Sequence, residues 1–232
     1  MGRQALTGTR MIFGGYAAIG AGAAAMLGLH VATGLDPVHT VISEYAFETD
    51  GWLLPLSLTL FATAATVIAA LLARRREDRG AALLVGLWGV CMLLIGAFPT
   101  DAPGVPLSMS GGIHRYAAFV AFLAMPIAGL LVARRHASNP YARPVRLLSL
   151  AALGVLVLVV LPYVVRMLGV ELGNDDIPAG VTQRLVVGFE VAVLAMTGLV
   201  VGARGEAVPP AAPDRRYDHI RDDVLPALRE AG

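Results

Sequence analysis

The chain contains six apolar runs, each long enough to cross a lipid bilayer as a helix, which takes about 20 residues. A strand or an irregular segment would leave backbone N–H and C=O groups unpaired in hydrocarbon, so each run is predicted to be helical. Composition argues against a soluble protein with buried helices, because 56% of the residues are hydrophobic and only 15% are charged. Soluble proteins have about 25% charged residues. The predicted helices are 11–33, 52–72, 81–99, 112–132, 145–168 and 181–202.

The sequence therefore predicts an all-α fold, an integral membrane bundle of six transmembrane helices that forms one domain over residues 1–203. The connections are short, which favours antiparallel packing of consecutive helices. Glycine and alanine are frequent within the runs, as in 14–28, and small residues let membrane helices pack closely. Residues 204–232 are predicted to be a cytoplasmic tail, either disordered or a short amphipathic helix on the membrane surface.

The positions of the arginines predict the orientation of the bundle. The chain has 18 arginines and no lysine, and 15 of the arginines fall in the N-terminal segment, the second and fourth connections and the tail. The connections 34–51, 100–111 and 169–180 contain none. Positively charged connections stay on the cytoplasmic side of a membrane. We therefore expect a multi-pass protein of the cell membrane with both termini cytoplasmic and the arginine-free connections outside.

Charge and motifs also exclude some classes of function. The net charge is +1, so no overall basic excess indicates a nucleic-acid partner. The sequence has no glycine-rich loop of the phosphate-binding type, and no cofactor is predicted. The lipid bilayer is the partner that the sequence predicts.

Polar residues gather at the predicted outer edge of the bundle. Arg115, Arg166 and Arg184 lie within about one helical turn of that edge, where they can reach water or pair with carboxylates. Such arginines suit an anionic phosphate group, which a guanidinium binds through two parallel hydrogen bonds. The candidate ligand-binding residues are Ser43, Glu44, Asp101, His114, Arg115, Arg166, Arg184 and Glu190.

Glu190 is the carboxylate predicted to lie deepest in the membrane, about nine residues or roughly 13 Å below the outer end of the last helix. Burying a charge at that depth is unfavourable unless the charge is paired or faces a wet cavity. Arg166, at the end of the preceding helix, is the predicted partner. The pair would either lock the last two helices together or belong to a binding or proton-handling site.

Two other functions are considered beside ligand binding. His30, Asp101 and His114 are residue types that bind zinc, and a membrane-embedded hydrolase, with or without a metal, would use His114 and Asp101. The sequence has neither a paired-histidine zinc motif nor a G-x-S-x-G motif, so no metal site is predicted and binding is preferred to catalysis. The remaining alternative is a small transporter with Glu190 as its coupling site.

Five short motifs carry a resemblance to a known family. In order they are SEY at 43–45, Gly-Trp at 51–52, FPTD at 98–101, GGIH at 111–114 and QR at 183–184. With these motifs the chain resembles, over residues 10–203, the bacterial and archaeal membrane family catalogued as domain of unknown function 998. The resemblance implies a six-helix integral membrane protein and no particular activity. The motif positions that it singles out are Ser43, Glu44, Asp101, His114 and Arg184.

The residues and the resemblance lead to one preferred function. We expect the outer polar cluster to bind a lipid headgroup, a small anionic ligand or a partner membrane protein. The hydrolase and the transporter remain the alternatives.

Overall fold

The structure, a computed structural model, describes residues 2–102, 104–169 and 178–202. These ranges contain six α-helices, two short 3-10 helices and no strand, which confirms the predicted all-α fold. The predicted tail, 204–232, lies outside the described residues. The α-helices are α1 (Gly2–Thr33), α2 (Leu53–Ala73), α3 (Arg79–Ala97), α4 (Met109–Arg135), α5 (Ala142–Met167) and α6 (Ala179–Gly202), and the 3-10 helices are η1 (Ile42–Phe47) and η2 (Arg76–Asp78).

All six α-helices are long and apolar enough to span a membrane. Their outer surfaces carry large apolar side chains, such as Phe13, Leu83 and Val157, which are 68%, 75% and 63% exposed. An apolar exterior of this extent is stable against lipid chains and unstable against water. The fold is therefore that of a membrane protein with six candidate transmembrane helices.

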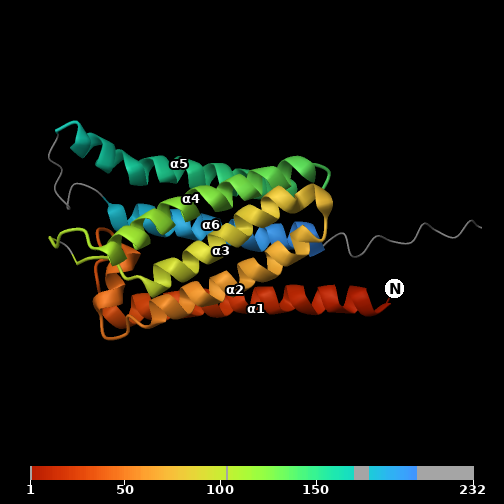
Figure 1. The fold of residues 1–232 in the computed structure, drawn as a ribbon, viewed down its shortest axis with the longest axis horizontal. Helices are drawn as coiled ribbons and strands as arrows, with labels where there is room; N and C mark the ends of the chain where they lie inside the picture. Colours follow the sequence, from red (N-terminus) through yellow and green to blue (C-terminus); the bar gives the residue numbers. More distant parts are fainter. Residues whose placement is uncertain (1, 103, 170–177, 203–232) are drawn as a thin grey trace, which may run out of the picture.

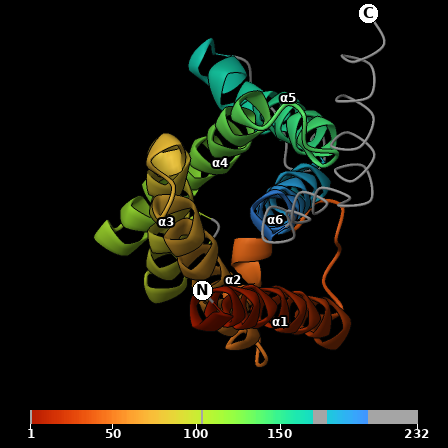
Figure 2. The ribbon, with the colours of Figure 1, turned by 90° about the vertical axis from the view of Figure 1, so that its right-hand side faces the viewer.

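Consecutive helices run antiparallel along one common direction (Figure 1). Seen end-on, α1 to α5 form a curved row, and α6 packs on the inner side of that row, in contact with α1, α2, α4 and α5 (Figure 2). The start of α1 and the end of α6 lie at the same end of the bundle, here called the terminal end. The opposite end, with η1 and the α3–α4 connection, is called the distal end.

Small residues let the helices approach closely, as the sequence predicted. Gly89 of α3 lies against α2, where a Cβ atom in its place would come within 3.1 Å of the Cβ of Ala65. Since lipid chains are as apolar as leucine, close van der Waals contact of this kind is a main source of helix association in membranes.

A buried polar group that the sequence analysis missed ties the helices together at the terminal end. Nε2 of His136, which follows α4, lies 3.0 Å from each carboxylate oxygen of Asp78 in η2, and both side chains are buried. Arg75 donates from Nη2 to the Val201 carbonyl of α6 over 2.9 Å. These contacts fix the α2–α3 connection against α4 and α6.

Candidate functional site

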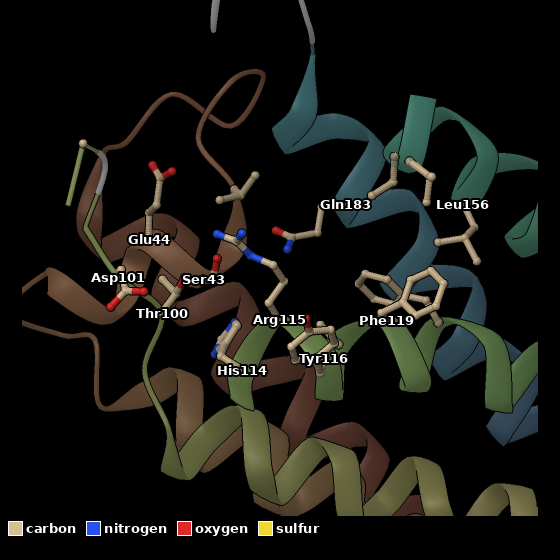
Figure 3. A pocket seen from close by; sticks show the side chains of 16 residues that line it. Ser43, Glu44, Thr100, Asp101, His114, Arg115, Tyr116, Phe119, Leu156 and Gln183 are labelled. Carbon is tan, nitrogen blue, oxygen red and sulfur yellow. The ribbon is translucent and has the colours of Figure 1, made fainter. Parts of the chain in front are cut away.

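A pocket of about 610 Å³ opens at the distal end of the bundle. Its walls come from the η1 segment, the α3–α4 connection and the distal parts of α4, α5 and α6 (Figure 3). The lining residues divide into a polar group at the mouth and an apolar group deeper between α4 and α5. The principal ones are Ser43, Glu44, Thr100, Asp101, His114, Arg115 and Gln183 in the polar group, and Ala118, Phe119, Phe122, Leu156, Val159 and Val160 in the apolar group.

Arg115 and Glu44 are two charged side chains of the mouth. The Arg115 side chain rises from α4 and ends between Glu44 and Gln183 (Figure 3). Neither the guanidinium of Arg115 nor the carboxylate of Glu44 forms a hydrogen bond or an ion pair within the described part of the chain. Partial burial raises the pKa of the Glu44 carboxyl.

The apolar part of the pocket is built on α4 and α5. Phe122 and Leu156 pack together in a small buried cluster that also includes Val186 of α6. Phe119, one turn before Phe122 on α4, is 48% exposed and lines the same pocket. The pocket therefore continues from a charged mouth to a hydrocarbon-like surface on helices that can span the membrane.

Asp101 lies at the start of α4, where it accepts a hydrogen bond from the Ser108 backbone N–H over 3.0 Å. The Ser108 hydroxyl in turn caps the helix by accepting from the Gly111 N–H over 3.1 Å. Hydrogen bonding from Ser108, with a smaller contribution from Arg115, lowers the pKa of the Asp101 carboxyl. The charged form therefore stabilises the fold above about pH 4, and this contribution is lost as the pH falls through the lowered pKa.

Gly111 is required where Asp101 meets α4. A Cβ atom at Gly111 would lie 1.8 Å from Oδ2 of Asp101, so Gly111→Ala is expected to displace the carboxylate from Ser108. We expect a loss of about 1–3 kcal/mol in the free energy of unfolding, typical of overpacking, measured by thermal unfolding in detergent. Gly112→Ala is the matched control, because a Cβ there meets nothing within 4 Å. Equal melting temperatures for the two variants would contradict this interpretation.

His114 joins the end of α3 to the start of α4. Its Nδ1 lies 2.9 Å from the carbonyl oxygen of Phe98, the residue that follows α3. Because a carbonyl only accepts, Nδ1 carries the hydrogen and donates it. The ring is 7% exposed and contributes one edge to the pocket. His114 thus ties the start of α4, which lines the pocket, to the end of α3.

Arg184 and His30 do not line the pocket; they form a separate network between α6, α1 and η1. Arg184 donates from Nε to Nε2 of His30 over 2.9 Å, and from Nη2 to the Tyr45 hydroxyl over 2.8 Å. Its Nη1 donates to the carbonyls of Thr40 and Gly180 over 2.7 and 2.9 Å. With its donors directed at the protein, Arg184 acts as a connection between elements.

The zinc candidates of the sequence analysis, His30, Asp101 and His114, each form at least one hydrogen bond within the protein. His30 uses Nδ1 for the Met26 carbonyl over 2.7 Å and Nε2 for Arg184. Across residues 2–102, 104–169 and 178–202, no three His, Cys, Asp or Glu side chains are arranged to hold a metal ion.

A comparison with known families confirms the resemblance carried by the five sequence motifs. A family model described as "Protein of unknown function (DUF998)" matches residues 16–200. The chain belongs to the DUF998 family. The matched region runs from α1 to α6 and includes every residue that lines the pocket. No curated protein and no solved structure matches the chain. The function of this DUF998 protein has to be argued from its pocket.

Glu190 of this DUF998 protein is fully buried in the middle of α6, away from the pocket. Its Oε2 accepts a hydrogen bond from Trp88 Nε1 of α3 over 3.0 Å, and its Oε1 has no partner in the described residues. The predicted partner, Arg166, belongs to α5, and its side chain lies outside the described part of the structure. The observed partner of Glu190 is therefore a neutral donor on a helix that the sequence analysis had not connected with it.

Besides the Asp78–His136 contact, the sequence analysis missed the contacts that Trp88, Tyr45 and Gln183 form in this DUF998 protein. Gln183 Oε1 accepts from the Ile42 N–H and so holds η1 against α6. Tyr45 is fully buried beneath Arg184, with its ring 5.4 Å from the guanidinium carbon. A signal existed for Trp88, because an indole N–H inside a membrane helix needs an acceptor and Glu190 is a carboxylate at similar depth.

Proposed function

We propose that this DUF998 protein is a multi-pass protein of the cell membrane that binds one phospholipid in the distal pocket. The observation that carries the proposal is the pocket itself, in which Arg115, with no hydrogen bond or ion pair to the described residues, adjoins an apolar surface on helices long and apolar enough to span a membrane. A phospholipid has the same division, a charged phosphate followed by hydrocarbon. The pocket volume of about 610 Å³ falls within the range of ligand sites, about 300–1,000 Å³.

The phosphate is assigned to Arg115. A planar guanidinium donates two parallel hydrogen bonds to phosphate oxygens, and that of Arg115 forms no hydrogen bond or ion pair with the described residues. The side chains of Ser43 and Gln183 line the same mouth and add polar groups beside it. Arg184, the other arginine with a described side chain at this end, has its donors directed at the protein.

The hydrocarbon of the lipid is assigned to the surface of Phe119, Phe122, Leu156 and Val160. Burying apolar surface there contributes about 25 cal/mol per Å² relative to water, but surrounding lipid offers nearly the same environment. Affinity and selectivity therefore come mainly from the charged mouth, and the apolar part sets the position of the chain.

Binding is preferred to catalysis because the acid–base candidates are held by the backbone. Asp101 accepts from the Ser108 N–H, and His114 donates to the Phe98 carbonyl. These contacts build the pocket wall. Orientation completes the proposal: the arginine-free connections 34–51 and 100–111 flank the pocket, which favours an extracytoplasmic mouth.

The test is lipid retention by the purified protein. After equilibration with an equimolar mixture of phosphatidylethanolamine and phosphatidylglycerol of identical acyl chains, native mass spectrometry should show one bound lipid. Arg115→Ala is expected to lower total retention about tenfold or more, because hydrogen bonds to charged groups contribute about 1.5–3 kcal/mol. Arg134→Ala is the control, since Arg134 is an exposed arginine at the other end of the same helix. Equal retention by the two variants, or no bound lipid in the wild type, would contradict the proposal.

A further inference from the structure

The charge of the pocket mouth is not that of a simple anion site. Two carboxylates, Glu44 and Asp101, line it together with one guanidinium, Arg115. Counting these three side chains, the mouth carries one positive and two negative charges. A ligand with phosphate as its only charged group would be attracted by the Arg115 guanidinium and repelled by both carboxylates. A ligand with a positive group beside the phosphate would interact favourably with the charges of all three side chains.

Resting on the proposed lipid binding, we propose that the pocket selects a zwitterionic headgroup that carries a phosphate and a primary ammonium, as in phosphatidylethanolamine. The phosphate lies on Arg115 and the ammonium lies on Glu44, with Asp101 contributing negative potential on the same side. The observation behind this assignment is that Arg115 and Glu44 share one pocket and yet are not paired with each other.

Glu44 is held in place for this role. It belongs to η1, whose neighbouring residue Tyr45 is fully buried and hydrogen bonds to Arg184 through its hydroxyl. The Ile42 N–H, at the start of the same short helix, donates to Gln183 of α6. The backbone on both sides of Glu44 is thus fixed to α6, while the Glu44 side chain itself is partly buried with no partner among the described residues. A preorganised, partly desolvated acceptor of this kind suits an ammonium donor.

The arrangement of the mouth also favours a primary ammonium over a quaternary one. Quaternary ammonium groups are usually held against the faces of several aromatic rings. Of the aromatic side chains that line the pocket, Tyr116 and Phe119 lie on one side of Arg115, whereas Glu44 and Asp101 lie on the other side (Figure 3). The cation subsite is therefore made of carboxylate oxygens, which accept hydrogen bonds from N–H groups that a quaternary ammonium lacks.

The experiment compares headgroups in one mixture. Wild-type protein is equilibrated with equimolar phosphatidylethanolamine, phosphatidylglycerol and phosphatidylcholine of identical acyl chains, and native mass spectrometry counts the retained species. The ethanolamine lipid is expected to exceed each of the others about tenfold, the effect of one charge-assisted hydrogen bond. Glu44→Gln should remove this preference by lowering retention of the ethanolamine lipid alone. Glu48→Gln is the matched control, an exposed carboxylate just after η1 that does not line the pocket.

The outcomes separate this inference from the proposed function. Retention of lipid without preference for ethanolamine, or with a preference unchanged by Glu44→Gln, would overturn the zwitterionic site and leave lipid binding in place. Loss of all retention in the wild type would overturn the proposed function itself. A competition with soluble glycerophosphoethanolamine identifies the source of the headgroup. We expect no displacement at millimolar concentration, and displacement would support the headgroup chemistry while assigning it to a free ligand.

Discussion

Replacing Arg184 with alanine is expected to lower the free energy of unfolding by about 3–5 kcal/mol. The substitution removes four hydrogen bonds at once and leaves His30, the Tyr45 hydroxyl and the carbonyls of Thr40 and Gly180 without their donor. Each buried acceptor left unpaired costs about 1–3 kcal/mol, and the estimate is set below the sum because Arg184 is only partly buried. The α1–α2 connection would lose its contacts with Arg184 and would keep the hydrogen bonds from the Ile42 N–H to Gln183 and from the Val181 N–H to the Val38 carbonyl.

The measurement is thermal unfolding in detergent, with limited proteolysis of residues 34–52 as a second readout of the same connection. Arg184→Lys should recover only part of the loss, since one ammonium cannot reach four acceptors in different directions. Arg134→Ala, which removes an exposed arginine from α4, is the control for the loss of charge. Arg184→Ala and Arg134→Ala melting at the same temperature would show that the network contributes nothing to stability.

The six helices could be predicted because each one is apolar along its whole length. In a chain with so few charged residues, such runs indicate transmembrane helices. The helix ends were less predictable, since they depend on single contacts. α4 begins at Met109 and not at residue 112, because Ser108 caps it and Asp101 binds the cap. α3 ends at Ala97 and not at residue 99, because the residue before a proline, here Phe98, is pushed out of the helical region.

The pocket residues were predicted in part. Alternating helix direction places Glu44, Asp101 and Arg115 at one end of the bundle, and the structure brings them into one pocket. Their position around the helix axes could not be derived, because a helix that is apolar on all sides does not show which side faces a neighbour. For the same reason Arg184 could not be separated from the pocket, nor Trp88 assigned to the carboxylate that it binds.

Substitution of Glu190, the buried carboxylate of α6, is the second change expected to have a large effect on the free energy of unfolding. Glu190→Ala is expected to destabilise the protein by about 3–5 kcal/mol, because it leaves the buried Trp88 N–H without an acceptor and creates a cavity in the fully buried space between α3 and α6. Glu190→Gln keeps the shape of the side chain and an oxygen acceptor, so it should remain within about 1 kcal/mol of the wild type. Thermal unfolding in detergent measures both variants.

A double-mutant cycle with Trp88→Phe decides what the contact contributes. Trp88→Phe removes the donor and leaves Glu190 without a partner among the described residues, so alone it should be destabilising. Replacing both partners, Trp88→Phe with Glu190→Leu, should cost less than the sum of the single changes, because no buried polar group remains unpaired. Additive losses would show that the two side chains do not interact. If instead Glu190→Gln were as unstable as Glu190→Ala, shape and hydrogen bonding would not explain the contribution of Glu190 to stability, and a role for the acid itself would follow.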